Sequence, residues 1–368
     1  PREIAVLADE YAKAAWTAGD PADREAVMAG AVAGMLTLAD PRPADEQLVA
    51  SLRSVQGEAR YETGDVDGAR ALLQEGISAL EPGPPSPGRA KLLAFLGWTY
   101  WRAGPVEEAT PWLERAVHEA EVGADAETLR WAKHDLGISY AFLGRLDEAI
   151  ELLEESFRLA RAADDRNLLL RCYINVPATR SNRGDDLRPL VSITEEGLNR
   201  ARRAAADNTV AWLAGNQAEF VAELGRLDAA SAYLDEAVAA STAAPLLAHM
   251  HLHQANVYRM QGDIAAADRV LGEAESSLAD VEPQIAAELT LARAWARWPD
   301  DPRGAIEALA LAVSDQDLWA PQRVVVAHEL ARMALRLDDR KTLGEAVKSH
   351  RDARPGRGPA RRQAEWRW

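Results

Sequence analysis

The sequence predicts an all-α fold, a right-handed superhelical solenoid of about nine helix–turn–helix repeats. First, the 368-residue chain is rich in Ala, Leu, Glu and Arg, which favour helices. Second, β-branched and aromatic residues do not alternate with polar ones over any long run, which argues against strands. Third, an internal period near 40 residues is marked by turn glycines at Gly64, Gly104, Gly144, Gly184, Gly225 and Gly262.

Each turn glycine occupies a fixed place in a repeated pattern. A small residue lies seven positions before the glycine and an aromatic residue four before it; an alanine lies five positions after it and a leucine nine after. Three repeats show the full pattern: Gly97, Tyr100, Ala109 and Leu113; Gly137, Tyr140, Ala149 and Leu153; and Ala255, Tyr258, Ala267 and Leu271. The glycine can end the first helix in a left-handed conformation. An aspartate that directly follows it, as Asp65, Asp185 and Asp263 do, can cap the second helix. The alanine allows close approach and the leucine fills the seam, so each hairpin leaves an apolar stripe for its neighbour to bury.

Weaker units extend the array toward both ends. Gly19 and Asp20 mark an early turn. A Pro/Asp turn near Asp300 replaces the glycine, and the last turn falls near Asp338. These units complete the predicted set of about nine repeats.

Prolines mark three irregular places in the array. Pro189 is expected in the first turn of a helix, where proline is tolerated. Pro177 is expected to kink or interrupt a helix. The segment EPGPPSPGR, residues 81–89, is expected to be a stiff loop between repeats rather than a polyproline ligand.

The formal charge of −16 is unevenly distributed. Nine Lys/Arg against three acidic residues between Arg340 and Trp368 give that segment a charge of about +6 and leave about −22 elsewhere. We therefore divide the chain into a repeat solenoid, residues 1–340, and a basic C-terminal tail or last helix, residues 341–368. An acidic solenoid is not expected to bind nucleic acid directly.

Cysteine usage and hydropathy are typical of a cytoplasmic protein. Cys172 is the single cysteine, which excludes an intramolecular disulfide and a metal site built on cysteine pairs. No run of about 18 apolar residues is present, so no membrane partner is expected. The chain starts at Pro1 without a basic and apolar leader, so no signal peptide is expected. No cofactor is expected either.

The repeated pattern resembles the tetratricopeptide repeat. That family's unit has a Leu-Gly pair, a tyrosine, a turn and then alanines, and Leu96, Gly97, Tyr100, Gly104 and Ala109 fill those places. The period departs from the family, because its standard unit has about 34 residues. The longer period here implies longer helices or longer loops between repeats.

A narrower resemblance covers most of the chain. Residues 57–77, 171–202 and 213–238 look like the repeat region of large bacterial LuxR-type regulators, in which an ATPase domain precedes the repeats. In that family the repeats sense an inducer or partner. The sequence has no G-x-x-x-x-G-K-[ST] motif and no convincing recognition helix. The resemblance therefore implies an effector-sensing region that takes part in transcription regulation and signal transduction without binding ATP or DNA itself.

The tetratricopeptide resemblance also implies a binding surface. In that family, first-helix residues offset from the seam line a concave groove. Carried over residue by residue, they are Lys91, Trp98, Arg102, Trp131, His134, Arg171, Asn175, Asn182, Trp212, Asn216, Glu219, His249, His253, Asn256 and Arg259. Asn175 and Asn216 share one position and are expected to form a small amide ladder. Such a mixture of aromatic, amide and charged groups suits a peptide, a protein or a small-molecule effector.

Two alternatives stay open. A free-standing scaffold would hold a protein partner on its convex face or its ends. An enzyme or metal protein would use His249 and His253, which share one helix face at the spacing of two metal ligands. Both chemistries need further convergent groups that the sequence does not supply nearby. We therefore expect a binding protein, not an enzyme, with no catalytic residue and no metal site.

Overall fold

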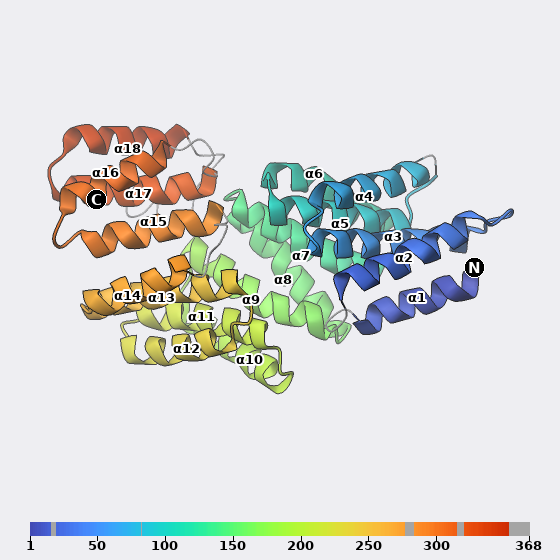
Figure 1. Cartoon of the computed structure of the whole chain (residues 1–368), viewed down its shortest axis with the longest axis horizontal. Coiled ribbons are helices and arrows are strands. Elements are labelled where there is room, and N and C mark those ends of the chain that lie inside the picture. Colours follow the sequence, from blue (N-terminus) through green and yellow to red (C-terminus); the bar gives the residue numbers. More distant parts are fainter. Residues whose placement is uncertain (16–19, 82, 277–282, 315–319, 353–368) are drawn as a thin grey trace. The chain divides into compact units, whose positions relative to one another are not determined.

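The fold is all-helical, as predicted. The computed structural model describes residues 1–15, 20–81, 83–276, 283–314 and 320–352, and these residues form eighteen α-helices without a strand (Figure 1). The chain divides into two compact units. Unit 1 comprises residues 1–143 and 148–168, and unit 2 comprises residues 144–147 and 169–368.

Unit 1 holds the first seven helices and most of the eighth. They are α1 (Arg2–Ala15), α2 (Pro21–Leu36), α3 (Pro43–Glu62), α4 (Val66–Leu80), α5 (Pro87–Ala103), α6 (Val106–Val122), α7 (Ala126–Phe142) and α8 (Leu146–Ala162). Unit 2 holds most of the ninth helix and the rest. They are α9 (Arg166–Arg183), α10 (Leu187–Arg203), α11 (Asp207–Glu223), α12 (Leu227–Ala240), α13 (Ala244–Gln261), α14 (Ile264–Ser276), α15 (Pro283–Arg297), α16 (Pro302–Val313), α17 (Ala320–Arg336) and α18 (Arg340–Asp352).

The odd-numbered helices form a layer of their own in each unit. In unit 1, α3 packs against α1 and α5, and α5 packs against α7. In unit 2, α13 packs against α11 and α15, and α15 packs against α17. Each of these odd-numbered helices is the first helix of a repeat. First helices therefore lie side by side within each unit, with the second helices outside them.

The turns within the repeats fall where the sequence predicts. All six turn glycines have positive φ, from 60° at Gly104 to 97° at Gly184. The side chains of Asp65 and Asp263 accept hydrogen bonds from the backbone N–H groups of residues 68 and 266, both at 3.0 Å. One capping prediction was wrong. The cap of α10 is Asp186, because both carboxylate oxygens of Asp185 are held by arginines.

The closest contacts between paired helices occur at the small residue of the pattern. A Cβ atom placed on Gly97 would lie 2.5 Å from Cγ of Leu113, and one placed on Gly137 would lie 2.8 Å from Cγ of Leu153. These leucines come nine residues after the turn glycine and are fully buried. Only a residue without a side chain leaves them this space.

Pro177 does not interrupt its helix, contrary to one of the two outcomes expected. The helix α9 continues from Arg166 to Arg183 through this proline, at the cost of the backbone hydrogen bond that a proline cannot donate. Pro189 lies in the first turn of α10, as predicted.

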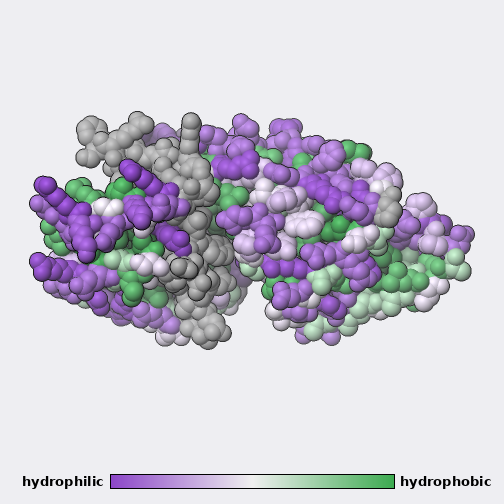
Figure 2. All heavy atoms as spheres, turned by 90° about the horizontal axis from the view of Figure 1, so that it is seen from above, coloured by the Kyte–Doolittle hydropathy of each residue, from purple (hydrophilic) through white to green (hydrophobic). Residues whose placement is uncertain are grey.

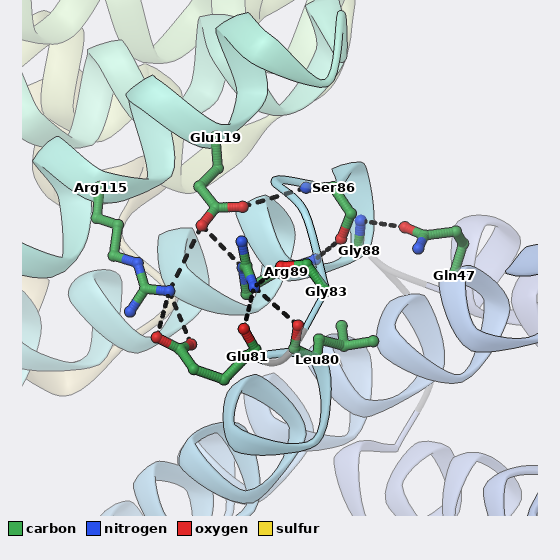
Figure 3. Close-up of polar contacts among 9 residues, drawn as sticks. All are labelled: Gln47, Leu80, Glu81, Gly83, Ser86, Gly88, Arg89, Arg115 and Glu119. Carbon is green, nitrogen blue, oxygen red and sulfur yellow. Dashed lines mark hydrogen bonds and ion pairs between the residues drawn. The ribbon is translucent and has the colours of Figure 1, made fainter.

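The proline-rich loop between α4 and α5 is held by a buried arginine (Figure 3). Arg89 Nε donates to Glu119 Oε1 at 2.8 Å, and both side chains are about 5% exposed or less. The same guanidinium donates to the carbonyl oxygens of Leu80, Glu81 and Gly83. These carbonyls lie at the end of α4 and in the loop, where no backbone N–H group of the helix is left to donate to them. The loop is therefore anchored to α6 through Glu119.

Hydrophobic side chains are also exposed on the two N-terminal helices, α1 and α2. Ile4, Leu7 and Leu36 are 63–64% exposed. The right-hand end of Figure 2, where Figure 1 places α1 and α2, accordingly shows a hydrophobic area among otherwise hydrophilic surface.

Gly97→Ala tests the close approach of paired helices. The added methyl group collides with Leu113, so we expect a loss of about 1–3 kcal/mol of stability. Gly30→Ala is the matched control in α2, because nothing lies within 4 Å of its Cβ position. Alanine favours helix over glycine, so this control should gain up to about 1 kcal/mol. Chemical denaturation measures both, and equal effects would contradict the packing described.

Candidate functional site

All fifteen predicted groove residues lie on odd-numbered helices. Five lie in unit 1, on α5 and α7, and ten lie in unit 2, on α9, α11 and α13. The first-helix layers therefore carry every residue of the set. Their exposure differs, and only some of them can meet a ligand.

Two of the unit 1 residues are packing residues instead. Trp98 is 9% exposed, with its ring centroid 4.6 Å from that of Tyr61 and 6.3 Å from that of Phe95. His134 is fully buried, and its Nδ1 lies 3.0 Å from a carboxylate oxygen of Asp135. The prediction that these two side chains are open to a ligand was wrong, because both are buried.

The other three unit 1 residues remain partly accessible. Lys91 Nζ donates to Ser51 Oγ at 3.0 Å. Trp131 Nε1 donates to Asp165 Oδ2 at 3.1 Å. Arg102 is exposed, with its guanidinium 5.6 Å from the ring centroid of Trp98. Cation–ring contacts of this kind hold the arginine over the aromatic cluster.

The asparagines of unit 2 bond to backbone carbonyls. Asn175 donates to the carbonyl of Arg171 within α9 at 3.0 Å, and Asn216 reaches from α11 to the carbonyl of Ile174 at 3.1 Å. Asn216 therefore ties α11 to α9, whereas Asn175 bonds within its own helix. Asn182 is exposed near the end of α9.

An exposed aromatic ring begins a connected row of side chains on α11 and α13. Trp212 is 39% exposed, and its ring centroid lies 5.0 Å from that of His249. Glu219 is exposed one turn beyond Asn216 on the same helix. The row continues from His249 to His253, whose Nε2 atoms are 3.1 Å apart.

Glu288, His249 and His253 form one chain of hydrogen-bond contacts, here called the histidine relay. His249 Nδ1 lies 3.0 Å from Glu288 Oε2. Burial opposes charge on His249, but Glu288, with a smaller effect from Glu219, raises its pKa above the ordinary value. Burial and the neighbouring charge of His249 lower the pKa of His253 to about 4. When His249 is protonated, it donates to Glu288 from Nδ1 and to neutral His253 from Nε2.

This relay does not assemble a metal centre. Within the described ranges, no group of three or more His, Cys, Asp or Glu side chains is arranged to hold a metal ion. The Nε2 atoms of His249 and His253 instead face each other in a hydrogen bond.

A pocket opens next to the relay, between α13, α14 and α15. Its volume is about 190 Å³. Polar groups on its wall come from His253, Asn256, Arg259, Glu288 and Trp295, and the remaining lining is leucine and alanine. Three predicted groove residues thus meet at one pocket. It is smaller than the roughly 300–1,000 Å³ of most small-molecule sites, so it suits a single side chain.

The part of this surface that lies on α15 and α17 was not predicted from the sequence. Apart from His134, which lies ten positions before Gly144, the predicted groove residues occur thirteen, nine, six and two or three positions before the turn glycine. Counting back from Asp338 gives Glu329, Arg332 and Arg336 at nine, six and two positions. Asp338 takes the glycine's place with a φ of 54°.

The irregular turn after α15 explains why two further residues, Glu288 and Trp295, were not predicted. Asp300 holds the glycine's place, because Ala305 and Leu309 follow it by five and nine positions. Counted from Asp300, Glu288 and Trp295 lie twelve and five positions back, one residue short of the register of the groove residues of α13. Asp301 caps α16 by accepting from the N–H of Gly304 at 2.9 Å. Counting from Asp300, the turn marker chosen from sequence, shifts the register by one residue. That shift points to the wrong side chains.

Sequence comparison matches part of the chain to a known repeat. Two family models of the tetratricopeptide repeat match it, one over residues 129–163 and the other over residues 50–75 and 90–115. These segments are tetratricopeptide repeats. No curated protein sequence matches the chain. No described helix is long and apolar enough to cross a membrane.

Solved structures share the fold at low sequence identity. A Rap protein complexed with Competence and Sporulation Factor has a TM-score of 0.69 and 11% identity, with 96% of this chain and 98% of that chain covered. NprR in complex with its cognate peptide NprX has a TM-score of 0.64 and 12% identity, with 94% and 97% covered. A signal transduction ATPase with a tetratricopeptide repeat sensor, from Pyrococcus horikoshii, has a TM-score of 0.53 and 13% identity, with 89% and 52% covered.

His253→Gln tests the relay through pH dependence. Unfolded histidine has a pKa of about 6.5, so between that value and the folded pKa of about 4 the unfolded state binds more protons. Stability is therefore lost as pH falls through this window. Between neutral and mildly acidic pH, the midpoint temperature of thermal unfolding should therefore fall less for the variant than for the wild type. His118→Gln, at an exposed position in α6, should behave like the wild type. A His253→Gln midpoint that falls as steeply as the wild type's would contradict the relay.

Proposed function

We propose that the chain is a regulatory, effector-sensing domain that binds a peptide segment on the first-helix layer of unit 2. One observation carries this proposal: an exposed tryptophan, the histidine relay and a side-chain-sized pocket follow one another along α11, α13 and α15. Rings supply apolar contact, and the polar groups between them can pair with a backbone.

The size of the pocket favours a peptide over a drug-sized effector. A volume of about 190 Å³ accommodates one side chain, while the row leading to Trp212 offers contacts for the residues on either side. Structures similar in fold include NprR in complex with its cognate peptide NprX and a Rap conjugation gene regulator in complex with the Phr* peptide, which supports the same ligand class here.

We extend the proposal to the regulator that such a domain serves. The STAND ATPase that shares the fold carries a tetratricopeptide repeat sensor, and the sequence resembles the repeat region of LuxR-type regulators. Peptide binding by this chain would then control an ATPase in the cytoplasm. The proposal gives the chain no catalytic step, and no direct contact with ATP or nucleic acid.

A scaffold role is favoured by a different observation. Ile4 and Leu7 on α1 and Leu36 on α2 expose apolar surface that a protein partner could bury. In that role Leu7→Ser abolishes partner binding, and Trp212→Ala leaves it unchanged. The two roles therefore respond to opposite variants.

Trp212→Ala tests peptide binding directly. Peptides are selected from a phage-displayed library on the full chain, and the tightest is labelled for fluorescence anisotropy. Loss of a central aromatic contact should weaken binding by about tenfold or more. Leu224→Ala removes a hydrophobic side chain of similar exposure at the end of α11 and should leave the affinity unchanged. Equal affinity of both variants and the wild type would refute the assignment.

A further inference from the structure

Three arginines surround one tryptophan on the first-helix layer of unit 2. The guanidinium carbons of Arg259, Arg332 and Arg336 lie 5.1, 5.6 and 5.2 Å from the ring centroid of Trp295. They come from α13 and α17, on either side of the α15 helix that carries the tryptophan. We call these four residues the arginine cluster.

The arginine cluster has more positive charge than the described residues around it neutralise. Glu329 accepts from Arg332 at 3.0 Å and from Trp295 Nε1 at 3.1 Å. Within the described part of the chain, Arg259 and Arg336 form no ion pair. Three cations against one carboxylate leave the cluster with an excess of positive charge.

The environment of Arg259 makes an added anion favourable. Its guanidinium donates to Asn256 Oδ1 at 2.6 Å. Burial lowers its pKa, Glu329 acts in the opposite direction, and the like charges of Arg332 and Arg336 lower it further. A bound carboxylate would relieve this repulsion and could accept the paired hydrogen bonds that guanidinium groups form.

The pocket and the arginine cluster are continuous. Arg259 and Trp295 belong to both, and leucine and alanine side chains supply the apolar lining of the pocket. A ligand that fills the pocket with an apolar group therefore brings its neighbouring group within reach of the guanidinium groups.

We propose that the bound peptide is acidic, with an apolar side chain in the pocket and an adjacent Asp or Glu carboxylate held by Arg259, Arg332 and Arg336. This inference rests on the proposed peptide-binding function and specifies its ligand. Glu219, Glu288 and Glu329 lie on the same layer, so a polyanion such as nucleic acid would meet repulsion that a short acidic segment avoids.

The charge of the C-terminal segment makes it an unsuitable occupant. Residues 353–368 contain five arginines and one glutamate. Such a segment would repel the arginine cluster, which supports a separate acidic partner.

Three labelled peptides of equal length test the proposal by fluorescence anisotropy with the full chain. Their central residues are Glu-Leu-Glu, Lys-Leu-Lys and Glu-Ala-Glu, between identical Gly-Ser flanks. The Glu-Leu-Glu peptide should bind about tenfold more tightly than either of the others, because only it supplies both the carboxylates and the apolar side chain. Equal binding of the lysine peptide would overturn the proposal.

A double variant separates the arginine cluster from net charge. Arg332→Gln/Arg336→Gln should lose about tenfold in affinity for the Glu-Leu-Glu peptide. Arg188→Gln/Arg340→Gln removes the same charge from side chains that are 80% and 89% exposed elsewhere in unit 2, and should bind normally. Equal losses in the two double variants would contradict the proposal. Circular dichroism confirms that each variant keeps its helical content.

Two further outcomes discriminate between ligand sources and between proposals. Displacement of the peptide by millimolar inorganic phosphate would show a free-anion site and overturn the inference. If the library selects neutral or basic peptides whose binding depends on Trp212, the acidic ligand is wrong and peptide binding stands. If no peptide of any composition binds, the proposed function itself fails.

Discussion

The close approach of two helices within each repeat is the constraint on which the rest of the structure depends. Gly97 and Gly137 leave space for Leu113 and Leu153, and no side chain on the glycine could share it. This contact sets the rotation of the first helix against the second. Because the distance to the turn glycine is the same in both repeats, their rotations match. Because the helices are rotated alike, the same positions of each first helix face outward from the first-helix layer in successive repeats.

The candidate site follows from that register. On α13, residues thirteen, nine, six and three positions before Gly262 are His249, His253, Asn256 and Arg259. They form a line along one helix face, and α15 and α17 add side chains beside them. The chemistry of the site comes from charged groups of α13, α15 and α17 that lie close together. Against the effect of burial, Glu288 raises the pKa of His249 beside neutral His253, while Glu329 pairs with only one of the three arginines, Arg332. A rigid helical layer positions these groups more accurately than loops would.

The sequence predicts this fold well because its signal is local and repeated. A glycine at a turn and a small residue seven positions earlier require only the chain's own geometry, and all six turns were found. Burial is harder to predict, because it depends on neighbours. Trp98 occupies a groove position six residues before its turn glycine, yet adjacent rings cover it. His134 lies ten residues before Gly144, one residue off a groove position, and is buried. The residues on α15 were missed because the turn before Asp301 differs from a glycine turn and shifts the count by one.

Peptide binding on the first-helix layer of unit 2 is tested most directly by hydrogen–deuterium exchange. The full chain is compared with and without a saturating selected peptide. Binding should slow exchange in α11, α13, α15 and α17 and leave α12 and α16 unchanged, since these second helices lie outside the layer. Protection confined to α1 and α2, or to α12 and α16, would contradict peptide binding at this layer.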